Sequence, residues 1–242
     1  YNVVDCKAAR ERNIVVSNIP AYSTNAVAQL VFSFILQTTN KVSLHSNAVF
    51  DGEWCKCPDF CFWKAPLYEL DGKTIGIIGF GSIGQRVSVI AKAFGMNVLA
   101  YTPHPKPDLF KDVRFVDLDR LLTESDFITC HCPLTPKTEN LINKETLSKM
   151  KSSAVLINTS RGPVINDYDL AEALNNNKIQ AAGLDVLTVE PPSDDNPLFK
   201  AKNCYITPHI AWAAYETRAR LLTILEENLK AFIDGKPQNV VN

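Results

Sequence analysis

Residues 74–95, TIGIIGFGSIGQRVSVIAKAFG, decide how the chain folds. Their first five residues, 74–78, form a nearly continuous apolar run, which is typical of a strand buried on both faces. From Ser82 onward, apolar residues recur every three or four positions, which predicts a helix with one apolar face. The stretch therefore predicts a strand, a glycine-rich turn and a helix in direct succession.

The turn carries Gly79, Gly81 and Gly84 in the spacing GxGxxG. Gly79 permits a tight turn, Gly81 lets a pyrophosphate approach the backbone, and Gly84 lets helix and strand pack closely. The N-terminus of the helix adds free N–H groups and a partial positive charge. Glycine turns are common, so the spacing alone is a weak signal. Its position between a buried strand and an amphipathic helix favours a dinucleotide site over a purely structural turn.

Strand and helix patterns alternate along the rest of the chain. We expect strands at 97–101, 126–131, 154–158, 179–186 and 204–206, and helices at 118–122, 143–150 and 167–174. This order predicts an α/β fold with a doubly wound parallel sheet, covered on both faces, with ligands at the carboxyl ends of the strands. Outside this region we expect a helix end at 4–12, a strand at 14–17, a helix from Thr24 and a long helix at 213–233.

Residues 41–70 show no clear pattern and are rich in aromatic side chains and proline. Many large apolar groups in a weakly structured segment would be costly in water. Either this arm folds over its own core, or it embraces a second subunit. We favour the second interpretation, a homodimer formed through the helix from Thr24 and the arm at 41–70.

The composition narrows the class of protein. The 242 residues carry a formal net charge of -1, which gives no electrostatic footprint for nucleic acid or an anionic membrane. The most apolar helix, around 26–36, is too short to span a bilayer. Seven cysteines, an odd number in a chain large enough to need no staples, suggest a reducing, cytoplasmic compartment. For the group Cys55, Cys57 and Cys61 we favour free thiols over a metal site, because no second ligand cluster follows.

Three segments end predicted strands and should open onto one crevice: 158–162, 183–190 and 207–212. They bring Arg161, Glu190 and His209. Singly, each residue has a structural explanation: a surface ion pair for Arg161, a solvated charge for Glu190, a hydrogen-bonded core imidazole for His209. A guanidinium grips a carboxylate with two parallel hydrogen bonds, and an imidazole transfers protons. Together at the ligand-binding edge of one sheet, the three indicate a catalytic set.

Five motifs in order, GFGSIG, HCPLTPKTENLIN, NTSRGPVIN, GLDVLTVEPP and TPHIAWA, resemble those of the D-2-hydroxyacid dehydrogenase family. The HIAWA ending is similar to the branch called glycerate dehydrogenase or hydroxypyruvate reductase. The resemblance covers essentially the whole chain. It implies a Rossmann-type dinucleotide-binding domain, an NAD cofactor, and catalytic roles for Arg161, Glu190 and His209.

The chemistry of that family suits these residue types. The nicotinamide would deliver hydride to C2 of a 2-oxo acid, with hydroxypyruvate or glyoxylate as expected substrates and D-glycerate or glycolate as products. His209 would donate the proton to the carbonyl oxygen. Glu190 would orient the imidazole and favour its charged form, and Arg161 would bind the substrate carboxylate.

The resemblance also implies contacts to the cofactor. Ser82 and Ile83 are expected on its phosphates. The ribose or adenine is expected beside Cys132, Pro133 and Thr138. The residues expected on the nicotinamide side are Thr159, Ser160 and Asp185. Asp185 also has a purely structural alternative, as a cap.

The chain departs from the family pattern after the second strand of the dinucleotide unit. An acidic residue normally binds the adenosine 2′-hydroxyl there. Counting 18 residues on from Gly84 reaches Thr102, and no carboxylate stands in the stretch 101–106. A 2′-phosphate would therefore meet no repulsion from this stretch, and His104 or Lys106 would attract one. We expect relaxed choice between NAD and NADP, with NAD still usable.

A second departure concerns the substrate domain. In the family this flavodoxin-like domain is built from both ends of the chain, and most of it precedes the segment that resembles residues 1–5. We therefore expect residues 1–19 and 212–242 to be remnants of that domain, and 20–211 to be the dinucleotide-binding domain. The 242-residue chain by itself is then expected to bind dinucleotide but to be weakly active or inactive.

Two other functions fit the same fold. A nucleotide-sensing interaction module, similar to the co-repressors related to this family, would not need the full set Arg161, Glu190 and His209. A formate or phosphonate dehydrogenase would act on a substrate without a 2-oxo group. The intact catalytic set favours an enzyme over the sensing module, and an assay with hydroxypyruvate and glyoxylate separates a 2-hydroxyacid dehydrogenase from a formate dehydrogenase.

Overall fold

The computed structural model describes residues 3–242. Within these residues, seven parallel strands form one sheet in the order β3-β2-β1-β4-β5-β6-β7. The strands are β1 (Thr74–Ile78), β2 (Asn97–Tyr101), β3 (Arg114–Phe115), β4 (Phe127–Cys130), β5 (Val155–Asn158), β6 (Ala181–Leu184) and β7 (Cys204–Ile206). The chain moves outward from β1 to β3 and returns past β1 to β4–β7, so the predicted doubly wound sheet is confirmed.

Helices and single turns of 3-10 helix connect these strands, as the alternating pattern predicts. They are α4 (Ser82–Ala93), α5 (Leu118–Glu124), α6 (Lys144–Lys149), η2 (Gly162–Val164), α7 (Asp167–Asn175) and η3 (Pro197–Lys200). Asn143 caps α6, because its Oδ1 accepts hydrogen bonds from the amides of Glu145 at 3.0 Å and Thr146 at 3.2 Å. The strand β3, only two residues long, was not predicted.

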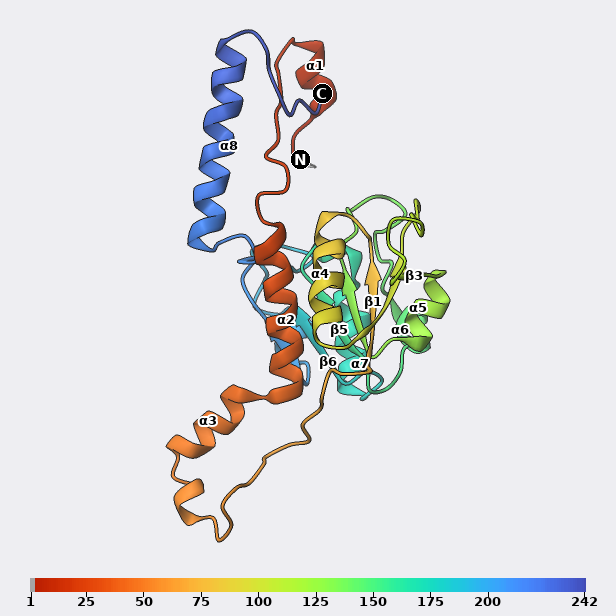
Figure 1. Ribbon diagram of the computed structural model, residues 1–242, viewed down its shortest axis with the longest axis vertical. Helices are drawn as coiled ribbons and strands as arrows, with labels where there is room; N and C mark the ends of the chain where they lie inside the picture. The colour runs from red at the N-terminus through yellow and green to blue at the C-terminus, as the bar shows by residue number, and fades with distance from the viewer. Residues whose placement is uncertain (1–2) are drawn as a thin grey trace. The chain divides into compact units, whose positions relative to one another are not determined.

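The sheet separates two apolar cores. One core is formed with α2 (Thr24–Asn40) and α4 and contains Val31, Ile35 and Val87. The other lies under α5, α6 and α7, which cover the opposite face (Figure 1). Successive residues of β5 enter the two cores in turn, because side chains alternate along a strand. Both faces of the sheet are therefore buried, as the apolar strand sequences predict.

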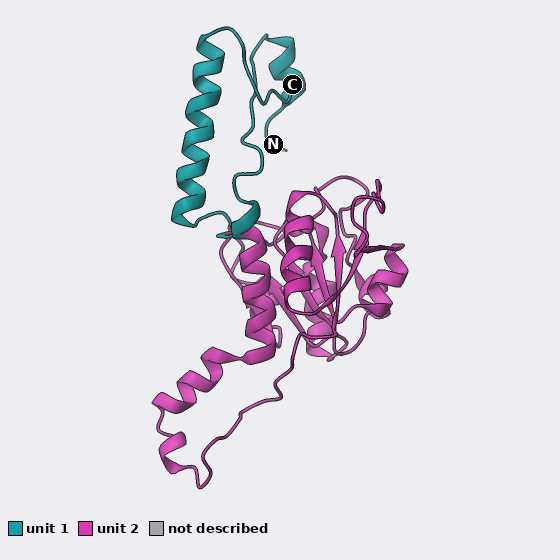
Figure 2. Cartoon of the chain, viewed as in Figure 1, with its two compact units in different colours: residues 1–26, 210–242 teal, residues 27–209 magenta. Residues whose placement is uncertain are grey.

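The chain divides into two compact units, coloured separately in Figure 2. Unit 2 is Val27–His209 and holds the sheet; unit 1 is Tyr1–Ala26 with Ile210–Asn242. Unit 1 contains α1 (Cys6–Glu11) and α8 (Tyr215–Ile233), which match the helices expected at 4–12 and 213–233. The Asp5 carboxylate caps α1 by accepting from the Ala8 amide at 2.9 Å.

The strand expected at 14–17 is wrong. Only Ser17 forms a β-bridge, with Val240 near the other end of the chain. The neighbouring backbone bonds to the C-terminal residues in two ways. The Val241 amide donates to the Val16 carbonyl at 2.9 Å, and the side chain of Asn242 accepts from the Val16 amide at 2.9 Å and donates to the Ile14 carbonyl at 2.7 Å. These residues form an extended segment tied to the C-terminal residues, not a member of a sheet.

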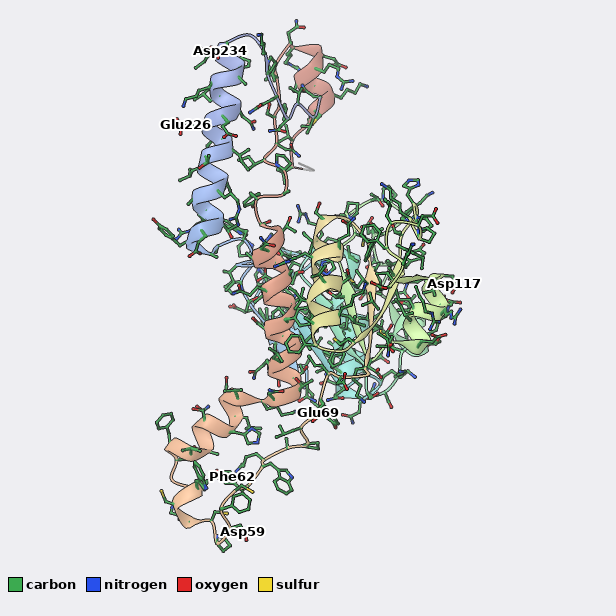
Figure 3. All side chains as sticks on the ribbon, in the orientation of Figure 1. Asp59, Phe62, Glu69, Asp117, Glu226 and Asp234 are labelled. Carbon is green, nitrogen blue, oxygen red and sulfur yellow. The ribbon has the colours of Figure 1, made fainter. Side chains whose placement is uncertain are left out.

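The arm at 41–70 is more regular than expected. It contains the helix α3 (Val42–Phe50) and the 3-10 helix η1 (Trp54–Lys56), so the prediction of an irregular segment was wrong for this half. The return half, 57–69, is irregular and leads to β1. Lys64 ties the halves together through an ion pair with Glu53 at 2.6 Å. Figure 3 shows the side chains along the arm, with Asp59 and Phe62 labelled.

The aromatic side chains of the arm do not fold over the core of unit 2. Phe50 is 86% exposed, Phe60 89% and Trp63 70%. The interpretation that the arm covers its own core is therefore wrong.

None of the helices in residues 3–242 is long and apolar enough to cross a bilayer.

Candidate active site

The glycine turn between β1 and α4 leaves open space above its backbone. Gly79 has a φ of 92°, and a Cβ there would lie 2.6 Å from the Cys132 amide nitrogen. A Cβ on Gly84 would overlap the Gly79 carbonyl, which shows how closely helix and strand pack. A Cβ on Gly81 would meet nothing within 4 Å. The turn is thus tightly packed below Gly79 and Gly84 and open at Gly81.

The open side of this turn faces the N-terminus of α4. Gly81 is the N-cap of the helix, and no side chain caps it. The first amides of a helix, here including those of Ser82 and Ile83, have no partner within the helix. Unpaired N–H groups and the helix dipole favour an anion at this position.

His209 and Glu190 are in hydrogen-bond contact at the carboxyl edge of the same sheet. The His209 Nδ1 lies 2.7 Å from Glu190 Oε2. Glu190 Oε1 accepts from the Leu187 amide at 2.9 Å, so both carboxylate oxygens are engaged. Because Nδ1 faces the carboxylate, the imidazole is left with Nε2 for a further partner. This arrangement holds the imidazole in one orientation.

The pair borders a cavity of about 530 Å³ beyond the ends of β6 and β7. Its lining includes Asp185, Glu190, Thr207 and His209, with Phe199 among the apolar groups. Asp185 is buried, and its carboxylate accepts from the Thr207 hydroxyl. The Asp185 carbonyl accepts from the His209 amide at 2.9 Å. Asp185 therefore helps to place the segment that carries His209.

Arg161 follows β5, two strands from β7, in a loop that is packed against the Glu190 loop. A Cβ on Gly162 would overlap the carbonyl of Leu187, so the two loops touch through their backbones. The Arg161 guanidinium is exposed, and its Nη1 donates to the Ser160 carbonyl at 2.7 Å. The Arg161 and Glu190 loops are therefore neighbours at one edge of the sheet.

The other residues expected beside the cofactor after β5 are built into the strand end. Ser160 donates through its amide at 3.0 Å and its hydroxyl at 2.8 Å to Asn158 Oδ1. Thr159 is buried, and its hydroxyl has no hydrogen-bond partner within residues 3–242. A buried hydroxyl without a partner is unfavourable unless a ligand or water supplies one. The Thr159 hydroxyl is thus available to hydrogen-bond a bound molecule.

The segment after β4 contains the other expected contacts. Cys132 is buried next to Gly79. The Thr138 hydroxyl donates to the Pro133 carbonyl at 2.6 Å and accepts from the Thr135 amide at 2.8 Å. Thr138 therefore organises the loop 133–138 through its own side chain. This loop follows the strand adjacent to β1, beside the glycine turn.

Thr102 directly follows β2, as the count from Gly84 predicts, and lines a smaller cavity of about 340 Å³. Sequence reasoning missed two charged neighbours in this lining, Asp117 and Arg120. They come from the start of α5, which β3 brings beside the end of β2; Figure 3 labels Asp117. Arg120 Nε donates to Glu124 Oε1 at 2.6 Å, and Asp117 caps α5. The sequence signal that could have marked this position is Asp117, a capping residue type directly before the expected helix at 118–122.

The cysteines are all unpaired, and among residues 3–242 no group of three His, Cys, Asp or Glu side chains is placed to hold a metal ion. Burial raises the pKa of the thiols of Cys130 and Cys132. Burial first, and the charge of Asp167 second, raise the pKa of Cys204 to about 12. These three thiols are neutral near pH 7 and act as apolar groups.

The sequence profile of the family "D-isomer specific 2-hydroxyacid dehydrogenase, NAD binding domain" matches residues 32–211. The chain belongs to this family. The resemblance noted from the five motifs is therefore confirmed, and the chain is an oxidoreductase that binds NAD. The match includes the glycine turn and the residues Arg161, Glu190 and His209.

Named relatives of this 2-hydroxyacid dehydrogenase extend the agreement. A hydroxypyruvate reductase of Blautia hydrogenotrophica is 51% identical over 100% of this chain and 76% of its own length. A glycerate dehydrogenase of Methylorubrum extorquens is 43% identical over 99% of this chain and 75% of its own length. The crystal structure of D-lactate dehydrogenase from Aquifex aeolicus, complexed with NAD and lactic acid, has a TM-score of 0.87 at 32% identity, covering 98% of this chain and 74% of that one.

The residues of this 2-hydroxyacid dehydrogenase fit an NAD molecule. A pyrophosphate needs an approach without side chains, and the space above Gly81 provides it. It also needs hydrogen-bond donors, which the uncapped N-terminus of α4 supplies. Thr159 adds a buried hydroxyl that has no partner in the part of the chain that the structure describes. These features follow β1 and β5, which flank β4 in the middle of the sheet, at the carboxyl edge where such a ligand binds.

Proposed function

We propose that the enzyme reduces hydroxypyruvate or glyoxylate, giving D-glycerate or glycolate. The observation that carries this proposal is the 2.7 Å contact between His209 Nδ1 and Glu190 Oε2, bordering a cavity at the carboxyl edge of an NAD-binding sheet. The printed names of the two relatives, hydroxypyruvate reductase and glycerate dehydrogenase, support the choice of substrate.

Each of three residues has a separate task in this reaction. When bound, the nicotinamide supplies a hydride to C2 of the oxo acid. His209 donates a proton from Nε2 to the carbonyl oxygen, so that carbon and oxygen together gain one hydride and one proton. Glu190 holds Nδ1 and thereby fixes which nitrogen faces the substrate. Arg161 grips the substrate carboxylate by turning its guanidinium away from the Ser160 carbonyl.

The nucleotide would lie along the carboxyl edge of the sheet. We assign its phosphates to Gly79, Gly81 and Gly84 with the amides of Ser82 and Ile83. The adenosine part would pass Thr102 and the loop of Cys132, Pro133 and Thr138. The residues assigned to the nicotinamide side are Thr159, Ser160 and Asp185. In this assignment residues 20–211 form the dinucleotide-binding domain, and 1–19 with 212–242 belong to a substrate domain.

We propose that NADP is also accepted. Thr102 places no charge at the end of β2, and Arg120 lines the same cavity, which favours a 2′-phosphate. Asp117, in the same lining, opposes it. The comparison of kcat/KM with NADH and with NADPH tests this. A preference for NADH beyond about a thousandfold, roughly 4 kcal/mol, would contradict relaxed choice.

We propose a homodimer formed through α2 and the arm at 41–70, in the cytoplasm. The exposed aromatic groups of the arm support the dimer, because such groups on a segment with few contacts to its own core are typical of an interface. Seven unpaired cysteines support the cytoplasmic compartment, where thiols are kept reduced.

Assays with hydroxypyruvate, glyoxylate and formate test the proposed reaction in an enzyme that spans the full length of the two relatives, of which these 242 residues cover 76% and 75%. We expect NADH oxidation with the two oxo acids and no NADH formation with formate. Arg161→Ala should lower kcat/KM for the oxo acid by at least about a hundredfold, because two charge-assisted hydrogen bonds are lost. Arg114→Ala, which removes a surface ion pair with Glu124, is the matched control and should stay within about twofold. An unchanged Arg161→Ala enzyme would contradict the role of this residue.

A further inference from the structure

One buried carboxylate joins both ends of the loop that carries Glu190. Asp167 is the first residue of α7 and only 8% exposed. Its Oδ1 accepts from the Thr188 hydroxyl at 2.9 Å, and its Oδ2 accepts from Asn196 Nδ2 at 3.0 Å. Thr188 stands two residues before Glu190, and Asn196 six residues after it. The two hydrogen bonds therefore hold both ends of the loop at 188–196 to one carboxylate.

The two partners of Asp167 have little freedom to turn away. Asn196 Oδ1 accepts from the Leu198 amide at 3.0 Å, which fixes the orientation of its side-chain amide. Thr188 directly follows Leu187, whose amide donates to Glu190 Oε1 at 2.9 Å. A continuous path thus leads from Asp167 through Thr188 and Leu187 to the carboxylate that orients His209.

The surroundings of Asp167 indicate a carboxylate kept for its hydrogen bonds. Among residues 3–242, no lysine or arginine forms an ion pair with it. Burying a carboxylate without a cation is unfavourable unless hydrogen bonds and dipoles offset the cost. The first turn of α7 supplies a favourable dipole, and the two side-chain donors supply the hydrogen bonds. A neutral apolar residue would avoid that cost but could not bind both ends of the loop.

We propose that Asp167 is a positioning residue for the proton donor. It holds the loop at 188–196 so that Glu190 meets His209, and it takes no part in binding the nucleotide. This inference rests on the proposed function, in which His209 donates the proton to the substrate. It assigns to Asp167 an effect on kcat that is transmitted through Thr188 and Glu190.

Three variants separate this role from general stability. Asp167→Ala removes both hydrogen-bond acceptors. It should lower kcat about tenfold, which is part of the rate enhancement that a well-placed proton donor gives. Kd for NADH should stay within about twofold of the parental value. Asp167→Asn should restore kcat to within about threefold, because its carbonyl still accepts from Asn196 while its amide donates to the Thr188 oxygen. Asp169→Asn is the matched control. It removes a charge from the same helical turn, but the Asp169 carboxylate accepts from the Lys144 amide and not from the loop, so kcat should not change.

Hydrogen exchange of the Leu187 amide supplies a readout other than turnover. That amide should exchange faster in Asp167→Ala and at the parental rate in Asp169→Asn, with exchange in β4, β5 and α4 unchanged in both. Faster exchange throughout the sheet, or an equal loss of kcat in Asp169→Asn, would overturn the proposal. If Asp167→Ala does not fold, Thr188→Val decides, because it removes one donor at similar size. It should lower kcat and speed exchange of the same amide, and no change in either would contradict the proposal.

Glu190→Gln, assayed beside these variants, distinguishes failure of the proposed function from failure of the inference about Asp167. If Glu190→Gln leaves kcat at the parental value, the proposed function fails. If Glu190→Gln lowers kcat at least tenfold while Asp167→Ala leaves kcat and the Leu187 amide unchanged, only the inference about Asp167 fails.

Discussion

At the scale of single residues, the backbone conformation of His209 helps to fix the orientation of its imidazole ring. Its φ of 53° is in the left-handed region, which side chains other than glycine seldom occupy. Its amide donates to the carbonyls of Asp185 and Thr207, each at 2.9 Å, and these bonds hold the unusual conformation. The ring is then directed by the main chain as well as by Glu190. Local strain of this kind is typical of functional positions.

His131 is a second histidine whose environment has a measurable consequence. It follows β4, and its Nε2 lies 2.9 Å from the Thr129 hydroxyl. The residue keeps some exposed surface, but its Nδ1 is buried and has no partner among the described residues. Desolvation of these nitrogens lowers the pKa of His131 from 6.5 to about 3. The ring is therefore neutral in the folded protein at every pH near neutrality.

This histidine should make the fold sensitive to mild acid. In the unfolded chain it protonates below pH 6.5 and in the folded chain only near pH 3, so the free energy of unfolding falls as pH decreases between these values. The loss from pH 7 to pH 5 is up to about 2 kcal/mol. Urea unfolding of His131→Gln should show a correspondingly smaller loss over this range. His104→Gln, at an exposed site, is the control and should retain the parental slope. Equal slopes in all three proteins would contradict the account.

At the scale of elements, periodic apolar patterns predicted the strands from β1 to β7 other than β3 and the helices that cover them. The helix α3 was missed because only Ala48 of its residues is buried, so no apolar stripe marks it. The strand β3 is too short to show alternation. The segment 14–17 looked like a strand because it is apolar and β-branched, but its one bridge partner, Val240, lies far away in the chain.

In the candidate site too, sequence patterns predict local positions but not contacts between residues that are distant in the chain. Arg161, Glu190 and His209 stand at strand ends, and the carboxyl ends of parallel strands share one edge, so their sequence positions were enough to group them. Asp117 and Arg120 were missed because they reach Thr102 through the sheet order, which the short β3 hides. Asp167 was read only as a helix start, since no local pattern shows that the distant Asn196 returns to it.

Two glycines offer opposite tests of how these elements pack. A Cβ on Gly183 of β6 would lie 2.5 Å from Cγ of the buried Phe34 on α2, so Gly183→Ala should lower the free energy of unfolding by about 1–3 kcal/mol. Gly81→Ala meets nothing within 4 Å and has a φ of -81°, so stability should change by less than about 0.5 kcal/mol. Its methyl group would occupy the space proposed for the pyrophosphate, and Kd for NADH should rise at least about tenfold.

Urea unfolding and quenching of protein fluorescence by NADH measure the two quantities on the same preparations. Each glycine variant serves as the control for the other. Loss of stability in Gly81→Ala, or unchanged NADH binding by it, would contradict the proposed path of the cofactor.

At the scale of the whole molecule, the arm at 41–70 exposes apolar side chains that the core of unit 2 does not cover. Its aromatic side chains are exposed, while its internal contacts, such as the ion pair of Lys64 with Glu53, hold it in a defined form. The helix α2 ends at Asn40, directly before the arm begins. A preformed arm with an apolar surface is suited to bind another copy of the chain, as proposed above.

Removal of the exposed aromatic groups should dissociate this dimer. Light scattering at tens of micromolar protein is expected to give a dimer mass for the parent. We expect a monomer mass, or a clear rise in the dissociation constant, for the double variant Phe60→Ser/Trp63→Ser. Tyr168→Ser, at a 74% exposed aromatic residue on α7, is the control and should remain dimeric. A monomeric parent would contradict the proposed interface, and so would a double variant that dimerises normally.

The most direct test of the central claim is the turnover of hydroxypyruvate by His209→Gln, with Kd for NADH measured on the same preparation. Glutamine keeps a polar side chain but cannot donate a proton as an acid. We predict that kcat falls by at least about a hundredfold while Kd for NADH stays within about twofold of the parental value. Turnover within about threefold of the parental rate would contradict the assignment of His209 as the proton donor.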